Sequence, residues 1–293
     1  TDLGRALSYS KEEWVTMVST SDTVRWVYLE LNLLGDPETR VHLPGRELHE
    51  LAVQEVSVER AILGEPCNIT VGVQNRGQIA EVGNFVLQVE GEVIANRVVS
   101  LGPGERQTIY VDWTPSKYQV SNITAQIICA EDLRTENDRK VVRKMVDRRV
   151  ESDETWTGNL TLPGGLLIDP LVTVTATGCT ILLPSCDLLY TFSLRGAFSL
   201  SGSTLQGSPF VIDSEGGDLE LVNSRLTGMS YERPCVFEKG RLSLLSAEVI
   251  GGAGWILNGT DVNMLGANLT WQSGEWRISN SEVSLVHLSG QYG

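Results

Sequence analysis

Length, composition and charge exclude several classes of protein. The chain has 293 residues, of which 41% are hydrophobic and 20% are charged, a composition typical of folded domains rather than of disordered segments. Its formal net charge of −14 offers no basic face for phosphate groups, so we expect neither nucleic acid nor an anionic membrane surface as a partner. No apolar run approaches the roughly 20 residues that cross a bilayer, and we predict no membrane span.

Residues 1–49 begin with a predicted helix and a predicted strand. Apolar residues between Leu3 and Val18 recur at helical spacing, and residues 24–34 are typical of a strand that ends at the turn beginning with Gly35. One helix and one strand cannot bury a core of their own. Because the chain also starts with Thr1 and shows no signal segment, we expect residues 1–49 to be the tail of an upstream domain in a longer protein.

Two short motifs in this segment carry a family resemblance. The words Asn32-Leu-Leu-Gly-Asp-Pro37 and Gly4-Arg-Ala-Leu7 resemble the closing part of the catalytic domain in gingipain-type cysteine peptidases, over about residues 1–43. The resemblance implies a peptidase parent, whose catalytic His and Cys would lie upstream. No residue here matches either one, so we predict that this chain has no catalytic residue and is not an enzyme. An unrelated helix–strand unit is the alternative.

Residues 50–150 change to short alternating strands. In the stretch that begins at Asn68, the apolar residues Ile69, Val71 and Val73 alternate strictly with polar or small ones, which predicts a half-buried strand. Similar runs follow at short intervals, joined by turns rich in Gly, Pro and Asn. This spacing predicts an immunoglobulin-like β-sandwich.

Two cysteines are placed at the ends of predicted strands in this sandwich. Cys67 opens the second strand and Cys129 ends the penultimate one, so we predict a disulfide between them that ties the two sheets together. Such a bridge would contribute roughly 4 kcal/mol by closing a long loop. Two buried free thiols are the alternative.

The order of motifs in the sandwich carries a second resemblance. Gly64-Glu-Pro66, Val71–Gly77, Leu101-Gly-Pro-Gly-Glu105 and Val111–Pro115 resemble the cell-adhesion-related domain family of bacterial and archaeal surface proteins. The resemblance spans about residues 50–147. It implies a spacer or adhesive module whose partners are other surface proteins, and it carries no catalytic residues.

Residues 151–293 contain self-similar segments. The template is apolar-x-apolar-x-x-small-x-apolar, and its steps vary around about 20 residues, as loop insertions between the turns of a coil would produce. The copies that we align are Val172–Cys179, Phe198–Leu205, Leu219–Leu226, Leu242–Val249, Val262–Leu269 and Trp276–Val283. Apolar residues spaced by two point inward from a short strand, the small residue allows a corner, and stacked rungs satisfy one another's backbones. The pattern predicts a right-handed parallel β-helix.

The start of this region supports the same fold. Trp156-Thr-Gly-Asn159 resembles the opening of β-helix domains in prokaryotic surface proteins, where a similar word precedes the first rung. Cys179 and Cys186 are close enough in sequence for us to predict a second disulfide, and Cys235 is predicted to be a buried core thiol.

Several tripeptides match the acceptor pattern for N-glycosylation. They begin at Asn68, Asn122, Asn159, Asn258 and Asn268. Together with cysteines suited to an oxidising compartment, they predict an extracellular or cell-surface glycoprotein. Chance matches in Thr-rich strands are the alternative.

The chain shows no pattern for a metal or a cofactor. None of its five cysteines forms a Cys-x-x-Cys pair, so we predict no zinc site. The tightest acidic cluster comprises Asp213, Glu215, Asp218 and Glu220. It lacks a defined calcium loop, and solvated corner residues are the preferred interpretation over a calcium or sugar site.

These observations favour a non-catalytic, extracellular structural or adhesive module, in the order tail (1–49), immunoglobulin-like sandwich (50–150) and β-helix (151–293). Its expected partners are other surface proteins, copies of itself, or glycans. The alternatives are an accessory C-terminal region of a secreted cysteine peptidase, a subunit of a self-assembling filament or lattice, and a β-helix that binds or cleaves polysaccharide.

Overall fold

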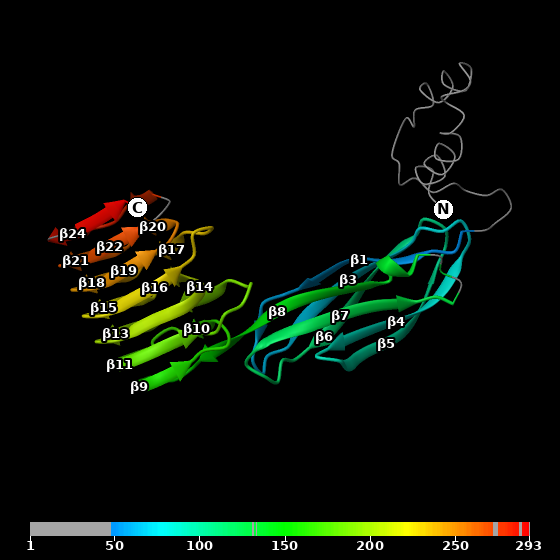
Figure 1. Ribbon diagram of the computed structural model, residues 1–293, viewed down its shortest axis with the longest axis horizontal. Coiled ribbons are helices and arrows are strands. Elements are labelled where there is room, and N and C mark those ends of the chain that lie inside the picture. The colour runs from blue at the N-terminus through cyan, green and yellow to red at the C-terminus, as the bar shows by residue number, and fades with distance from the viewer. Residues whose placement is uncertain (1–47, 131, 133, 272–274, 287–288, 293) are drawn as a thin grey trace, which may run out of the picture. The chain divides into compact units, whose positions relative to one another are not determined.

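The computed structural model describes residues 48–130, 132, 134–271, 275–286 and 289–292. From His49 onward the chain forms one compact unit. It contains an immunoglobulin-like β-sandwich followed by a right-handed parallel β-helix, which confirms the predicted fold class (Figure 1). The predicted N-terminal helix and strand, with the gingipain-like motifs, lie outside the described residues.

Two sheets form the sandwich. The first has the order β1-β3-β6, with antiparallel strands β1 (Leu51–Val58), β3 (Cys67–Asn75) and β6 (Arg106–Trp113). The second has the order β5-β4-β7-β8, with strands β4 (Glu81–Val89), β5 (Glu92–Leu101), β7 (Val120–Ile128) and β8 (Arg139–Val150). The short strand β2 (Ala61–Ile62) pairs parallel with β8, and the 3-10 helix η1 (Thr135–Asn137) precedes β8.

Strict alternation of apolar residues builds the sandwich core. Ile69 and Val71 of β3 are fully buried, and Ile123 and Ile127 of β7 are fully buried in the other sheet. Because successive side chains of a strand point to opposite faces, every second residue reaches the space between the sheets. Burying a side chain such as Phe85 contributes about 1.5–3 kcal/mol relative to leaving it exposed.

Each turn of the β-helix contributes strands to three faces. The first face stacks β9 (Glu154–Thr161), β11 (Thr173–Leu183), β13 (Ala197–Ser201), β15 (Asp218–Val222), β18 (Arg241–Leu245), β21 (Asp261–Leu265) and β24 (Val283–Val286) (Figure 1). The second face continues from the later parts of β9 and β11 into β14 (Thr204–Glu215), β16 (Arg225–Met229), β19 (Glu248–Gly251), β22 (Asn268–Trp271) and β25 (Ser289–Tyr292). The third face holds β10 (Leu166–Ile168), β12 (Tyr190–Leu194), the end of β14, β17 (Cys235–Glu238), β20 (Gly254–Asn258) and β23 (Glu275–Ser279).

The repeat template describes the first face, one corner and the second face. Phe198 pairs in register with Leu219, which pairs with Leu242, and that residue pairs with Val262. The small residue of the four middle copies lies buried at the corner, as Ser203, Ser224, Ala247 and Ala267. Here Ser224 Oγ accepts a 3.1 Å hydrogen bond from the Ser203 amide, so the corners of successive rungs are tied together.

Two copies of the template are aligned differently from the prediction. Val174, rather than Val172, pairs with Phe198, so the first copy is shifted by two residues. Trp276 pairs with Trp255 on the third face, whereas Val283 is the residue that pairs with Val262. Val172 lies two residues before the true repeat position, and Trp276 lies on the preceding face.

Candidate functional site

The sandwich and the β-helix share one strand. Residues of β8 up to Met145 pair antiparallel with β7, and Arg148 to Val150 pair parallel with β10. The amide of Arg148 donates to Gly165 O at 2.9 Å, and the amide of Asp169 donates to Val150 O at 3.1 Å. Strand β8 therefore acts as the first rung of the third face while it is still part of the sandwich.

Side chains reinforce this junction. Arg149 donates through Nε to Asp169 Oδ1 at 2.9 Å and through Nη1 to Glu65 Oε1 at 2.8 Å. It thereby links a sandwich loop to the β-helix, and its two hydrogen-bonded carboxylates raise the pKa of the guanidinium. The hydroxyl of Tyr118 donates to Gly164 O at 2.7 Å, and burial raises the pKa of this phenol.

Asp147 is a buried acid at the same junction. Its Oδ2 accepts a hydrogen bond from Arg60 Nε at 2.9 Å. Burial raises the pKa of the Asp147 carboxyl, and the neighbouring Arg60 partly offsets this effect. Asp147 and Arg60 thus form a polar pair beneath the surface where the two modules meet.

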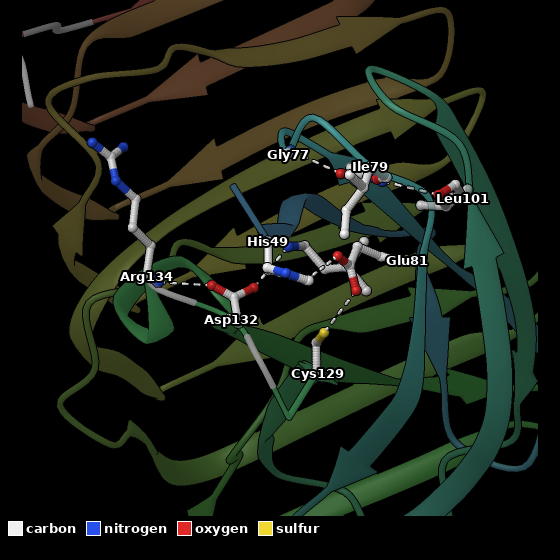
Figure 2. Close-up of polar contacts among 10 residues, drawn as sticks. His49, Gly77, Ile79, Glu81, Leu101, Cys129, Asp132 and Arg134 are labelled. Atoms are coloured by element: carbon white, nitrogen blue, oxygen red, sulfur yellow. Dashed lines mark hydrogen bonds and ion pairs between the residues drawn. The ribbon is translucent and has the colours of Figure 1, made fainter. Parts of the chain in front are cut away.

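A second group of polar side chains lies at the opposite end of the sandwich (Figure 2). The carboxylate of Glu81 lies between His49 and Cys129: His49 Nδ1 is 2.6 Å from Oε1, and the Cys129 thiol donates to Oε2 at 3.3 Å. Asp132 Oδ2 accepts the amide of Leu51 at 2.7 Å. These contacts fix the start of β1 against the end of β7.

Buried carboxylates accumulate beside this group. Glu50 and Asp138 are 3% and 6% exposed. Burial is the largest of the causes that raise the pKa of Asp138 to about 6. The charge of Asp132 and its hydrogen bond to Asp138 come next, followed by the charges of Glu136 and Glu50. Within the described ranges, no three His, Cys, Asp or Glu side chains converge in a way that could hold a metal ion.

The predicted glycosylation sites lie on both modules. Asn122, Asn159, Asn258 and Asn268 are exposed, whereas Asn68 is half-buried in β3 and its Oδ1 is buried without a partner. The Asn258 tripeptide ends in Thr260, which is fully buried and donates to Phe237 O at 3.1 Å. Glycosylation of these residues stays a prediction.

Neither predicted disulfide is formed in the structure, where none of the five cysteines is joined to another. Cys67 lies beside Lys144, which pairs with the first residues of β7, while Cys129 follows the last residue of that nine-residue strand. At about 3.3 Å per residue the two lie roughly 25 Å apart, whereas a disulfide needs Cα atoms within about 7 Å. Cys67 is buried, as in the alternative of buried thiols, whereas Cys129 is half-buried.

Cys179 and Cys186 are held at different places on the neighbouring rung. The Cys179 amide donates to Ser203 Oγ at 3.0 Å, and the Cys186 amide donates to Ser208 Oγ at 2.8 Å. Cys235 is a buried core thiol in β17, and burial raises its pKa to about 12. These environments suit structural thiols rather than reactive ones.

The acidic cluster on the β-helix is divided between two faces. Asp213 and Glu215 lie on the third face, where they contact Arg233 and Arg195. The other two side chains also have partners: Asp218 Oδ1 accepts the Arg241 amide at 2.9 Å, and Glu220 Oε2 accepts the Ser199 hydroxyl at 2.9 Å. Each carboxylate has its own partner within the β-helix.

Comparison with known proteins gives structural neighbours only. No family model matches the chain, and no curated protein matches it. A CARDB domain from Pyrococcus furiosus, solved in complex with di-metal ions, is 24% identical over 34% of this chain and 96% of its own, with a TM-score of 0.32. A domain of a Methanosarcina acetivorans protein, assigned to the cell surface by inference, is 15% identical over 34% of this chain and 92% of its own (TM-score 0.30).

A β-glucosidase from Listeria innocua, solved with glucose, also matches. It is 18% identical over 40% of this chain but only 19% of its own, with a TM-score of 0.25. At these identities the likeness concerns the fold alone.

The sole helix among the described residues, η1, is three residues long and cannot cross a membrane.

Proposed function

We propose that this chain is a non-catalytic, extracellular structural and adhesive module in which the sandwich and the β-helix act as one stiff spacer. The observation that carries the proposal is strand β8, which belongs to both modules. A flexible linker would leave backbone groups bonded to water between two bodies. Here the chain passes from one module to the other inside a hydrogen-bonded strand, with Arg149 and Tyr118 as side-chain ties.

An extracellular location is supported by the surface of both modules. Four of the five acceptor asparagines are exposed, so glycans would meet no steric barrier there. The net charge of −14 favours solubility at a crowded surface. The partners proposed for such a module are other surface proteins, further copies of the chain, or glycans.

The non-catalytic part of the proposal is supported by the group around Glu81. This carboxylate accepts a hydrogen bond from the Cys129 thiol at 3.3 Å, so the thiol is engaged in a contact between strands of the sandwich. No described contact favours a peptidase accessory role, a filament subunit or a polysaccharide-cleaving site over a spacer, and these alternatives stay predictions.

Hydrogen exchange measured by mass spectrometry on the intact chain tests the stiffness. We expect the amides of Arg148 and Asp169 to exchange as slowly as those of β7, because both donate to backbone carbonyls across the junction. Exchange at the rate of an exposed loop between Val146 and Asp169 would show a flexible linker and overturn the spacer.

Labelling of intact source cells with a membrane-impermeant amine reagent tests the location. Lys117 and Lys140 are exposed, so both should carry the label before lysis. A chain labelled only after lysis would contradict an extracellular role.

A further inference from the structure

A groove runs along the surface where the sandwich meets the third face of the β-helix. Its larger part is a hollow of about 520 Å³ between residues of β2 and β8 on one side and residues of β12, β14 and the preceding loop on the other. A second hollow of about 280 Å³ continues it along the β-helix. The two hollows share Arg60, Ser193, Asp213 and Arg233, so they form one groove. Ligand sites in proteins typically measure about 300–1,000 Å³ and often lie between modules.

Basic side chains gather in this groove although the chain is strongly acidic. Arg60, Arg143, Lys144 and Arg233 line the larger hollow with only two carboxylates, Asp147 and Asp213. Arg195 extends the series in the smaller hollow. The larger hollow therefore has a local excess of basic side chains on a molecule of net charge −14, and an anionic ligand would be attracted to it rather than to the rest of the surface.

The arginines are held in place but keep donors free. Arg60 uses Nε for Asp147, and Arg233 uses Nη2 for Asp213 at 2.5 Å. Arg143 is similarly tied to Asp187 by Nη1. Their side chains remain 41%, 46% and 42% exposed, and each guanidinium has five N–H donors, so donors remain for a ligand.

Lys144 is the cation with the weakest compensation. Its Nζ donates to Val58 O at 3.0 Å, and it forms no ion pair with a carboxylate in the described chain. The ammonium is half-buried, and this burial lowers its pKa. A ligand carboxylate nearby would offset that cost, because an opposite charge favours the charged form.

The groove also carries acceptors and hydroxyls between its cations. Asp213, Glu215 and Glu238 add negative charge along it, and Thr191 and Ser193 add hydroxyl groups. A densely anionic peptide would be repelled by those three carboxylates. A chain with spaced carboxylates and many neutral hydroxyls would satisfy both kinds of lining residue.

We propose that this groove binds a glycan containing uronic acid residues. Arg60, Arg233 and Lys144 take the sugar carboxylates, while Ser193 and Asp213 contact sugar hydroxyls. The inference names a ligand class for the adhesive half of the proposed function. The groove exists only where the two modules meet, and the spacer half of the proposal has its own test in hydrogen exchange at the junction, so failure of either half can be told apart.

Calorimetric titration with uronic acid oligosaccharides of four to six residues tests the proposal on the full chain. We expect saturable binding that weakens as salt is raised, because charges attract the ligand. Neutral glucose oligosaccharides and hexaglutamate should bind at least about tenfold more weakly. No binding of the uronic acid oligosaccharides overturns the proposal, and equal binding of the neutral sugar or of the acidic peptide overturns the assigned class.

Matched variants locate the site. Arg60→Gln and Arg233→Gln should each weaken uronate binding by about tenfold, as expected for a lost charge-assisted hydrogen bond. Arg106→Gln changes an exposed residue of β6 outside the groove and should leave the affinity unchanged. If Arg106→Gln weakens binding as much as the groove variants do, the attraction is diffuse and no site exists.

A measurement on the unaltered chain avoids any loss of folding in the variants. Acetylation of Lys144 by an amine reagent should slow at least about threefold when the groove is saturated with uronate oligosaccharide, since the ligand covers the amine. Acetylation of Lys117, outside the groove, serves as the internal control. Equal rates at Lys144 with and without bound sugar would place the ligand elsewhere.

Discussion

Asp138 keeps 6% of its surface exposed and shares the end of the sandwich with Asp132, Glu136 and Glu50. The backbone of Asp138 has a structural role, because its carbonyl oxygen accepts a hydrogen bond from the Ile127 amide at 2.8 Å. Its carboxyl, in contrast, is placed where water is scarce and like charges are near. Ionisation of the Asp138 carboxyl is therefore electrostatically unfavourable in the folded state.

This cost predicts a pH dependence with a definite sign. The pKa of about 6 in the folded state lies above the ordinary aspartate value of 3.8, so the folded state holds the proton more tightly than the unfolded chain does. Stability should be full below about pH 4, should fall as the pH rises through 6, and should lose on the order of 1–3 kcal/mol in total.

Asp138→Asn should remove most of this fall and raise the melting temperature at pH 8, measured by circular dichroism between pH 5 and pH 8. Asp112→Asn, at an exposed position of β6, is the matched control and should leave the pH profile unchanged. A pH profile of Asp138→Asn that coincides with that of the original chain would contradict the assigned cause.

At the scale of elements, the corners of the β-helix decide which residues are allowed. At the corners that follow the first-face segments of β11, β13, β15, β18 and β21, one residue adopts a left-handed conformation with φ between 48° and 63°. These residues are Gly178, Gly202, Asn223, Ser246 and Gly266. Asn tolerates this region better than other residues that carry a Cβ atom. At Gly266 there is also space for a side chain, because a Cβ atom added by substitution would lie no closer than 3.6 Å to any neighbouring atom.

Gly240 at another corner is different. Its φ is 89°, and a Cβ there would lie 2.2 Å from Gly217 O in the neighbouring rung. Gly240→Ala should therefore cost at least about 2 kcal/mol in a urea titration, from strain and overpacking together.

Gly259→Asn is the control for that substitution. Gly259 also has a positive φ, of 62°, but its nearest neighbour would be 3.8 Å from the new Cβ. We expect a cost below about 1 kcal/mol, because only the left-handed backbone is unfavourable. Equal losses for the two variants would mean that backbone angle rather than contact decides.

Most elements of both modules could be predicted from the sequence. A half-buried strand shows apolar residues at every second position, and a stacked coil shows a repeated sequence motif. The exact register of the strands could not be predicted. Val172 and Val174 fit the template equally well in isolation, and only pairing with Phe198 selects Val174. Spacing of Cys67 and Cys129 along the chain likewise gave no information on which end of the sandwich each occupies.

The candidate groove could not be predicted at all. Arg60, Lys144 and Arg233 are separated by long stretches of sequence, and each belongs to an unremarkable polar position of its own segment. They meet only because β8 joins the two modules and brings β2 beside the third face. Such a site depends on tertiary packing, for which a single sequence contains no local signal.

At the scale of the whole described unit, the junction should couple the unfolding of the two modules. Tyr118→Phe removes the hydrogen bond to Gly164 O, and Arg149→Gln removes the ion pairs with Glu65 and Asp169. Each should cost roughly 1–2 kcal/mol. In scanning calorimetry the original chain should unfold in one transition, and the double variant should show two.

Tyr110→Phe is the control, since this tyrosine is 60% exposed on β6 and should leave the single transition intact. Two transitions in the original chain would contradict the coupling, because they would show that the shared strand does not transmit stability between the modules.

The shared strand also determines how the molecule would respond to tension. A pull along the chain reaches the coil through the covalent backbone of β8, whose paired neighbours run alongside it. Those hydrogen bonds would be loaded in shear and would have to yield together, whereas the rungs beyond contact only their neighbours and can peel off singly. Under load the coil should therefore lengthen stepwise from its far end while the junction holds.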